Sequence, residues 1–114
     1  MIEEKDLKAL RILPREKAFY FFTSIGNYTG QSASSLEEFM EKIKLVSESS
    51  LEFHIQRGDF EKWAAEVLED RELAEKIRSL QKMGLSSDAL RIRLAQIVAR
   101  HREDLKNREA RKRF

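Results

Sequence analysis

Ala18-Phe19-Tyr20-Phe21-Phe22 is the longest uninterrupted apolar run of the chain, and the fold class depends on it. Its density of aromatic residues is typical of a β-strand, whereas Ala18, Phe22 and Ile25 also fit positions i, i+4 and i+7 of a helix. No second strand-like segment is apparent, and a lone strand would leave its backbone N–H and C=O groups without partners. We therefore favour a helix for this run and expect an all-α fold.

The segment that follows is polar from residue 24 to residue 35 and rich in turn-forming residues, which predicts a loop. At its far end Ser34 with Glu37, and equally Ser35 with Glu38, match the reciprocal capping pattern of a helix start. Further helix starts are expected at these positions, in chain order: Ser49, Asp59, Asp70, and Ser87 or Asp88.

Apolar residues follow these starts at helical spacing. The clearest stripe runs from Phe60 through Trp63 to Leu68, and the last helix carries an apolar arc from Leu90 to Leu105. Pro14 predicts the end of a short helix over residues 3–12. We predict a single compact helical domain over residues 1–105, built from five to six short helices, and a basic C-terminal extension over residues 106–114.

The composition fits one soluble domain. The chain has 114 residues, of which 41% are hydrophobic and 37% charged. No apolar run approaches the roughly 20 residues that span a bilayer, and the charged N-terminus does not resemble a secretory leader, so we expect a cytoplasmic protein that does not bind membranes. Without cysteine, and with two histidines, neither a disulfide nor a metal site is expected. Abundant Lys, Arg and Glu is typical of thermophile proteins.

Positive charge gathers at the C-terminus. Seven cations and three carboxylates give residues 100–114 a net charge of +4, while the rest of the chain carries −2. Such an asymmetry is typical of contact with a polyanion, and cations gain affinity for phosphates by releasing counterions. The alternative is a solvated helix end whose cations favour the C-terminal dipole. The candidate phosphate-binding residues are Arg100, Arg102, Lys106, Arg108, Arg111, Lys112 and Arg113.

Residues 19–30 read Phe-Tyr-Phe-Phe-Thr-Ser-Ile-Gly-Asn-Tyr-Thr-Gly, and residues 35–39 read Ser-Leu-Glu-Glu-Phe. Together with Leu-Glu-Phe-His at 51–54 and Arg-Gly-Asp-Phe-Glu-Lys-Trp at 57–63, they resemble a functionally unassigned, mainly archaeal family of small domains over about residues 18–80. Members often have glycine where this chain has Glu69. The resemblance implies a small helical module with no known catalytic role, and it transfers no active-site residues.

His54 and Asp59 are candidates for acid and base, because a histidine near a carboxylate is a common proton-transfer pair. The spacing favours a structural interpretation. His54 lies one turn after Leu51, as a buried or boundary imidazole bonded to a carbonyl or carboxylate would, and Asp59 follows Gly58 where a helix cap is needed. No nucleophile or cofactor motif accompanies the pair. We expect no enzymatic activity, no cofactor and no small-molecule substrate. His101 is expected to pack at the boundary of the last helix.

A helix cannot turn four neighbouring rings inward, so at least one ring of residues 19–22 should project outward and offer a contact surface. The loop from Gly26 to Gly30 could hold an anion on its backbone N–H groups, although it lacks the lysine of a P-loop, and a plain turn with Tyr28 packed inward is the simpler interpretation. The candidate partner-binding residues are Tyr20, Phe21, Asn27, Tyr28 and Thr29.

We therefore expect a non-catalytic helical module that binds another protein, or a second copy of itself, in a regulatory or scaffolding role. The alternative function is association with RNA or the ribosome through the basic C-terminal residues.

Overall fold

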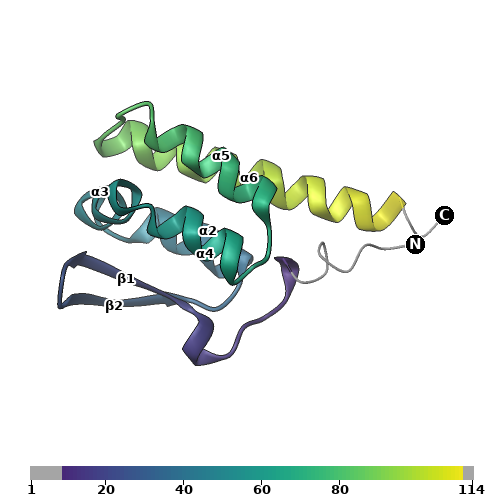
Figure 1. Cartoon of the computed structure of the whole chain (residues 1–114), viewed down its shortest axis with the longest axis horizontal. Coiled ribbons are helices and arrows are strands. Elements are labelled where there is room, and N and C mark those ends of the chain that lie inside the picture. The colour runs from purple at the N-terminus through teal and green to yellow at the C-terminus, as the bar shows by residue number, and fades with distance from the viewer. Residues whose placement is uncertain (1–8, 112–114) are drawn as a thin grey trace.

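A computed structural model describes residues 9–111 of the chain, and it has a mixed α/β fold (Figure 1). The prediction of an all-α fold is wrong, because a two-stranded antiparallel sheet forms at the segment where a helix was expected. The elements are the 3-10 helix η1 (Arg15–Lys17), β1 (Phe19–Ser24), β2 (Asn27–Ala33), α2 (Leu36–Leu45), α3 (Glu48–Arg57), α4 (Asp59–Glu66), α5 (Arg71–Gln81) and α6 (Ser87–Arg111).

The strand β1 forms because its aromatic residues separate cleanly onto two faces. Phe19 and Phe21 are buried, whereas Tyr20 is exposed and Phe22 half-buried. This alternation has the period of two that a strand requires. A two-residue turn follows, and Gly26 occupies its second position with φ +79, a conformation that side chains other than glycine rarely adopt.

The partner strand β2 lies inside the segment predicted as a loop, which corrects that prediction too. Its pairing with β1 is irregular: Tyr20 pairs with Ser32 and Phe22 with Tyr28, so β2 has extra residues opposite β1. Gly30, at φ +86, lies in this bulge. Thr29 satisfies backbone groups there, because its hydroxyl donates to the Phe21 carbonyl and accepts from the Gln31 N–H.

Two of the predicted helix starts are confirmed. At α2 the Glu38 N–H donates to the Ser35 hydroxyl, and the Glu38 carboxylate accepts from the Ser34 N–H. At α5 the Asp70 carboxylate accepts from the Leu73 N–H. The start predicted at Ser49 is two residues late, since the cap of α3 is Ser47.

The last helix begins at Ser87, one of the two positions predicted, and its buried residues continue to Leu105. The helix itself runs on to Arg111 without a break at residue 106.

Most of the helix predicted over residues 3–12 lies outside the described residues, and within them Ala9 and Leu10 are helical. In the described part of the chain no helix has the length and the apolar run needed to cross a membrane.

Three layers build the molecule (Figure 1): the hairpin, then α2, α3 and α4, then the α5–α6 pair. The aromatic part of the core lies between the hairpin and the middle layer, where Phe39 and Phe60 meet the rings of β1. Arg91 of α6 joins the α5–α6 layer to the middle layer, since its guanidinium donates to the carbonyls of Ile43 and Val46 at the end of α2. These layers hold β1 in a fixed position against α3 and α4.

Candidate functional site

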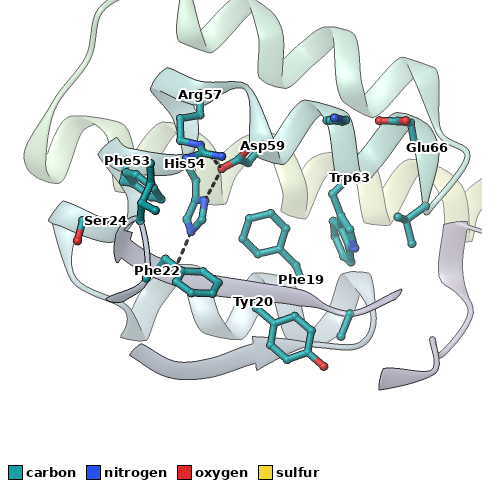
Figure 2. A pocket seen from close by; sticks show the side chains of 15 residues that line it. Phe19, Tyr20, Phe22, Ser24, Phe53, His54, Arg57, Asp59, Trp63 and Glu66 are labelled. Atoms are coloured by element: carbon teal, nitrogen blue, oxygen red, sulfur yellow. Dashed lines mark hydrogen bonds and ion pairs between the residues drawn. The ribbon is translucent and has the colours of Figure 1, made fainter. Parts of the chain in front are cut away.

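A cavity of about 520 Å³ opens along β1, bounded on its other side by α3 and α4, and we call it the β1 groove (Figure 2). That volume lies in the range of ligand-binding sites. Its apolar and aromatic wall consists of Ala18, Phe19, Tyr20, Phe22, Ile25, Phe53, Trp63 and Val67. Its charged side chains are Arg57, Asp59, Lys62 and Glu66. The groove therefore combines an aromatic wall with a small number of charged groups.

Trp63 holds the start of β1 in place at one end of the groove. Its indole N–H donates to the Lys17 carbonyl at 2.9 Å, which holds the residues before β1 against α4. Its ring packs edge-on against Phe19, with 5.7 Å between the ring centroids. Trp63 is the only tryptophan in the chain, so its fluorescence reports on this groove alone.

His54 fixes the middle of β1. The imidazole is 4% exposed and lies between Asp59 on one side and the backbone of Phe22 on the other (Figure 2). Its Nε2 accepts from the Phe22 N–H at 2.8 Å, so the proton of the neutral ring is on Nδ1. That Nδ1–H donates to Asp59 Oδ2, also at 2.8 Å. Both ring nitrogens are therefore engaged within the fold.

The carboxylate of Asp59 completes this arrangement. Its Oδ2 is 3.2 Å from Arg57 Nε, so it receives a cation as well as the imidazole N–H. The predicted role of Asp59 as a helix cap is wrong, because Gly58 precedes α4 and no side chain caps its N–H groups. The expected bond from His54 to a carboxylate is confirmed. The bond to Phe22 could not be predicted, since it joins residues 32 positions apart.

Burial lowers the pKa of His54 from its ordinary value of 6.5, and this outweighs the hydrogen bond and charge of Asp59, which act in the opposite direction. The unfolded chain then binds a proton more readily than the folded one. The stability that neutral His54 provides is therefore complete above pH 6.5 and is lost as the pH falls below that value toward the lower pKa of the folded state.

A family model described as a family of unknown function, DUF5752, matches residues 14–114. The chain belongs to this family. The match confirms the resemblance to an uncharacterised family and extends it to the segment after Gly84, which the resemblance did not cover. No curated protein and no solved structure matches the chain.

A second buried histidine in this DUF5752 chain joins α5 to α6. His101 is 0% exposed, more deeply buried than the boundary position predicted for it. Its Nε2 lies 2.6 Å from Asp70 Oδ2, and its Nδ1 lies 3.1 Å from Lys76 Nζ. Because an ammonium can only donate, Nδ1 accepts from Lys76 and the Nε2–H donates to Asp70.

Burial raises the pKa of Asp70, but the hydrogen bonds from His101 and from the Leu73 N–H, with the charge of Arg108, outweigh it, so the pKa is below its ordinary value of 3.8. Asp70, Glu72 and His101 also have ligand atoms within 4.8 Å of one another. Both oxygens of Glu72 accept from Arg108, and Lys76 donates to His101. The ligand atoms of the three residues are therefore already engaged within the fold, and the cluster supports no metal-site proposal.

The partner-binding residues predicted for this DUF5752 chain differ in their exposure in the structure. Phe21 is 0% exposed and belongs to the core, which removes it from any contact surface. Tyr20 and Tyr28 are 38% and 45% exposed and pack together, with 5.8 Å between their ring centroids. Asn27 is exposed beside the turn, whereas the hydroxyl of Thr29 is used within the bulge. Tyr28 thus faces outward, not inward.

The basic C-terminal residues also differ in their contacts: some form ion pairs within the fold and others do not. Arg102 pairs with Glu37 at 2.9 Å, and Arg108 forms two bonds with Glu72. Arg100 and Lys106 are exposed and have no acidic partner among the described residues. The side chain of Arg111 and the residues Lys112 and Arg113 lie outside the described part of the chain.

Proposed function

We propose that the chain is a non-catalytic interaction module of the cytoplasm and that its β1 groove binds an extended, apolar segment of a partner protein. One observation carries this proposal: an aromatic groove of about 520 Å³ runs along the whole of β1. Its lining residues extend from Ala18 at one end of the strand to Gly26 at the other. A six-residue strand is about 20 Å long. An elongated apolar groove of that length matches a chain segment better than a compact ligand.

The surface next to the groove supports a protein partner. Ile25 is 85% exposed at the tip of the hairpin, and the Tyr20–Tyr28 pair lies on the same hairpin. Aromatic residues are enriched in protein interfaces because they bury a large area with little loss of side-chain entropy. On the α4 side Lys62 and Glu66 are exposed and have no ionic partner among the described residues, so a bound segment can pair with both charges.

The state of His54 favours binding over catalysis. A general base needs a nitrogen that can reach the proton of a substrate. The Nε2 of His54 already accepts from Phe22, and the Nδ1–H already donates to Asp59. Asp59 is also paired with Arg57. The histidine and the carboxylate therefore hold β1 in place in this arrangement.

RNA binding through the C-terminal residues stays a second proposal. Arg100 and Lys106 support it, because both are exposed without an acidic partner in the described part of the chain. Arg102 and Arg108 weaken it, since phosphates would have to compete with Glu37 and Glu72. If the tail is the binding site, truncation after Leu105 should weaken RNA binding at 50 mM salt.

A peptide library displayed on phage tests the β1 groove. Ala18→Trp places a large ring in the groove, and Ala89→Trp places the same ring on an exposed position of α6 outside it. Peptides of 12 residues selected on the wild-type chain should share alternating apolar residues. Their affinity should fall by at least about tenfold in Ala18→Trp and stay unchanged in Ala89→Trp, because only the first substitution occupies the groove.

Two results would contradict the proposal. One is that no peptide is enriched, or that the enriched peptides bind Ala18→Trp as tightly as the wild type. The other is that the groove binds a second copy of the chain, in which case sedimentation would show a wild-type dimer and an Ala18→Trp monomer.

A further inference from the structure

The α5–α6 groove, a cavity of about 300 Å³ between these two helices, is distinct from the β1 groove. Its cationic lining consists of Lys76 from α5 and of Arg93 and Arg100 from α6. Ser79 and Gln96 add uncharged polar groups to the lining, and no carboxylate of the described residues is part of it. The cavity is therefore lined by three cations, of which Arg93 and Arg100 have no acidic partner among the described residues and Lys76 has Glu72 and Asp104 nearby.

Arg93 and Arg100 are available to a ligand. Both are exposed, and neither has an acidic partner among the described residues. They are seven residues apart, which is close to two turns, so they share one face of α6 at about 10 Å along the helix axis. The guanidinium group suits phosphate oxygens, because its N–H donors form a planar fork that can bind two of them at once.

The ammonium group of Lys76 is held in place by a buried histidine. Its ammonium donates to Nδ1 of His101, which is completely buried and fixed in turn by Asp70. Glu72 and Asp104 lie farther from the ammonium, each with an oxygen at 3.9 Å from Nζ. A cation that the protein has already ordered loses less side-chain entropy when it binds an anion. The buried histidine thus orients a charged group of the groove.

From these observations we infer that the α5–α6 groove binds the phosphate backbone of single-stranded RNA. The row of cations matches a polymer that carries one negative charge for every nucleotide. A duplex is too wide for a cavity of about 300 Å³, whereas a single strand can lie along it. The apolar lining residues Leu80, Met83 and Ile97 offer contact to a base or a ribose.

This site differs from the C-terminal tail of the second proposal, since it shares only Arg100 with it. It is also independent of the β1 groove, so either can fail alone. The double variant Arg93→Gln/Arg100→Gln removes two cations of the groove. The double variant Arg15→Gln/Arg71→Gln removes the same charge from two exposed arginines that do not line it.

Binding of a labelled 12-nucleotide oligouridine to the full-length chain, followed by fluorescence anisotropy from 50 to 200 mM salt, tests the inference. Arg93→Gln/Arg100→Gln should weaken binding at least about tenfold at 50 mM salt and reduce the salt slope by about 1.4, because each phosphate contact on a single strand contributes about 0.7. Arg15→Gln/Arg71→Gln should bind nearly as the wild type does.

Three outcomes would overturn the inference. The first is that the wild type fails to bind the oligonucleotide at 50 mM salt. The second is that both double variants weaken binding equally. The third is that a polyglutamate of equal charge competes as well as RNA does, which would point to an acidic protein. Thermal unfolding of each variant shows whether it has kept its fold.

Discussion

Replacing Phe21 with alanine should lower the free energy of unfolding by about 3–5 kcal/mol, the range found for buried aromatic side chains. Phe21 is completely buried at the centre of β1. Its ring stacks on Phe39 of α2, with 5.9 Å between the centroids, and contacts Phe19 edge-on at 4.9 Å. Removal of the ring leaves a cavity between the hairpin and the middle layer, because the packed helices can collapse only partially into it.

Phe22→Ala is the matched control, since it removes the same side chain from the next position of the same strand. Phe22 is half-buried and faces the groove, so its loss should cost only about 1–2 kcal/mol. Urea denaturation of both variants measures the difference. If Phe22→Ala were the more damaging of the two, the inner face of the segment would be that of the helical interpretation, which places Ala18, Phe22 and Ile25 toward the core.

His101→Ala should also be strongly destabilising, by about 3–5 kcal/mol, because it leaves a buried charge without its partner. Asp70 would keep only the Leu73 N–H, and Lys76 would lose its acceptor. Asp70→Ala removes the carboxylate and the cap of α5 together. The double variant should cost clearly less than the two single losses added, since residues in contact couple by about 0.5–3 kcal/mol.

Denaturant unfolding of the two single variants and the double variant at pH 7 gives this coupling. Additive losses would show that Asp70 and His101 do not act as a pair. Because the pKa of Asp70 is lowered, its stabilising effect is complete above pH 3.8 and is lost as the pH falls below that value, so the coupling should disappear only in strong acid.

The hairpin could not be predicted because half of it carries no strand pattern. Its partner strand, Asn27–Ala33, is polar, contains Gly30 and ends in the only fully buried residue of the strand, Ala33. The pairing depends on the turn at Gly26 and on packing against α2, and a search for a second apolar strand misses both. The available signal was the density of aromatic residues from Phe19 to Phe22, which is typical of a strand.

The helix starts were easier to predict, because a cap depends on residues three positions apart. Ser35 and Asp70 each accept from a backbone N–H within the first turn of their helix. Asp59 shows the limit of this rule. Its carboxylate serves His54 and Arg57 instead of the helix, and nothing local reveals that choice.

The two grooves lay beyond sequence reasoning, since each joins elements that are distant along the chain. The β1 groove brings Phe19 next to Trp63, 44 positions later. Arg100 was predicted to bind phosphate, but as part of a C-terminal tail. Its proximity to Lys76 follows from the antiparallel packing of α5 and α6, which spacing alone does not show.

His54 holds β1 in place and has no nitrogen free for proton transfer. Nitrogen-15 NMR of the labelled imidazole tests this directly across pH 8 to pH 4. We expect a neutral ring protonated on Nδ1 at pH 7, a pKa below 6.5, and a shift of the Phe22 amide signal when the ring finally titrates. A ring protonated on Nε2, or a pKa at or above 6.5, would show that His54 does not hold β1 in this way and would return His54 and Asp59 to the candidates for acid–base catalysis.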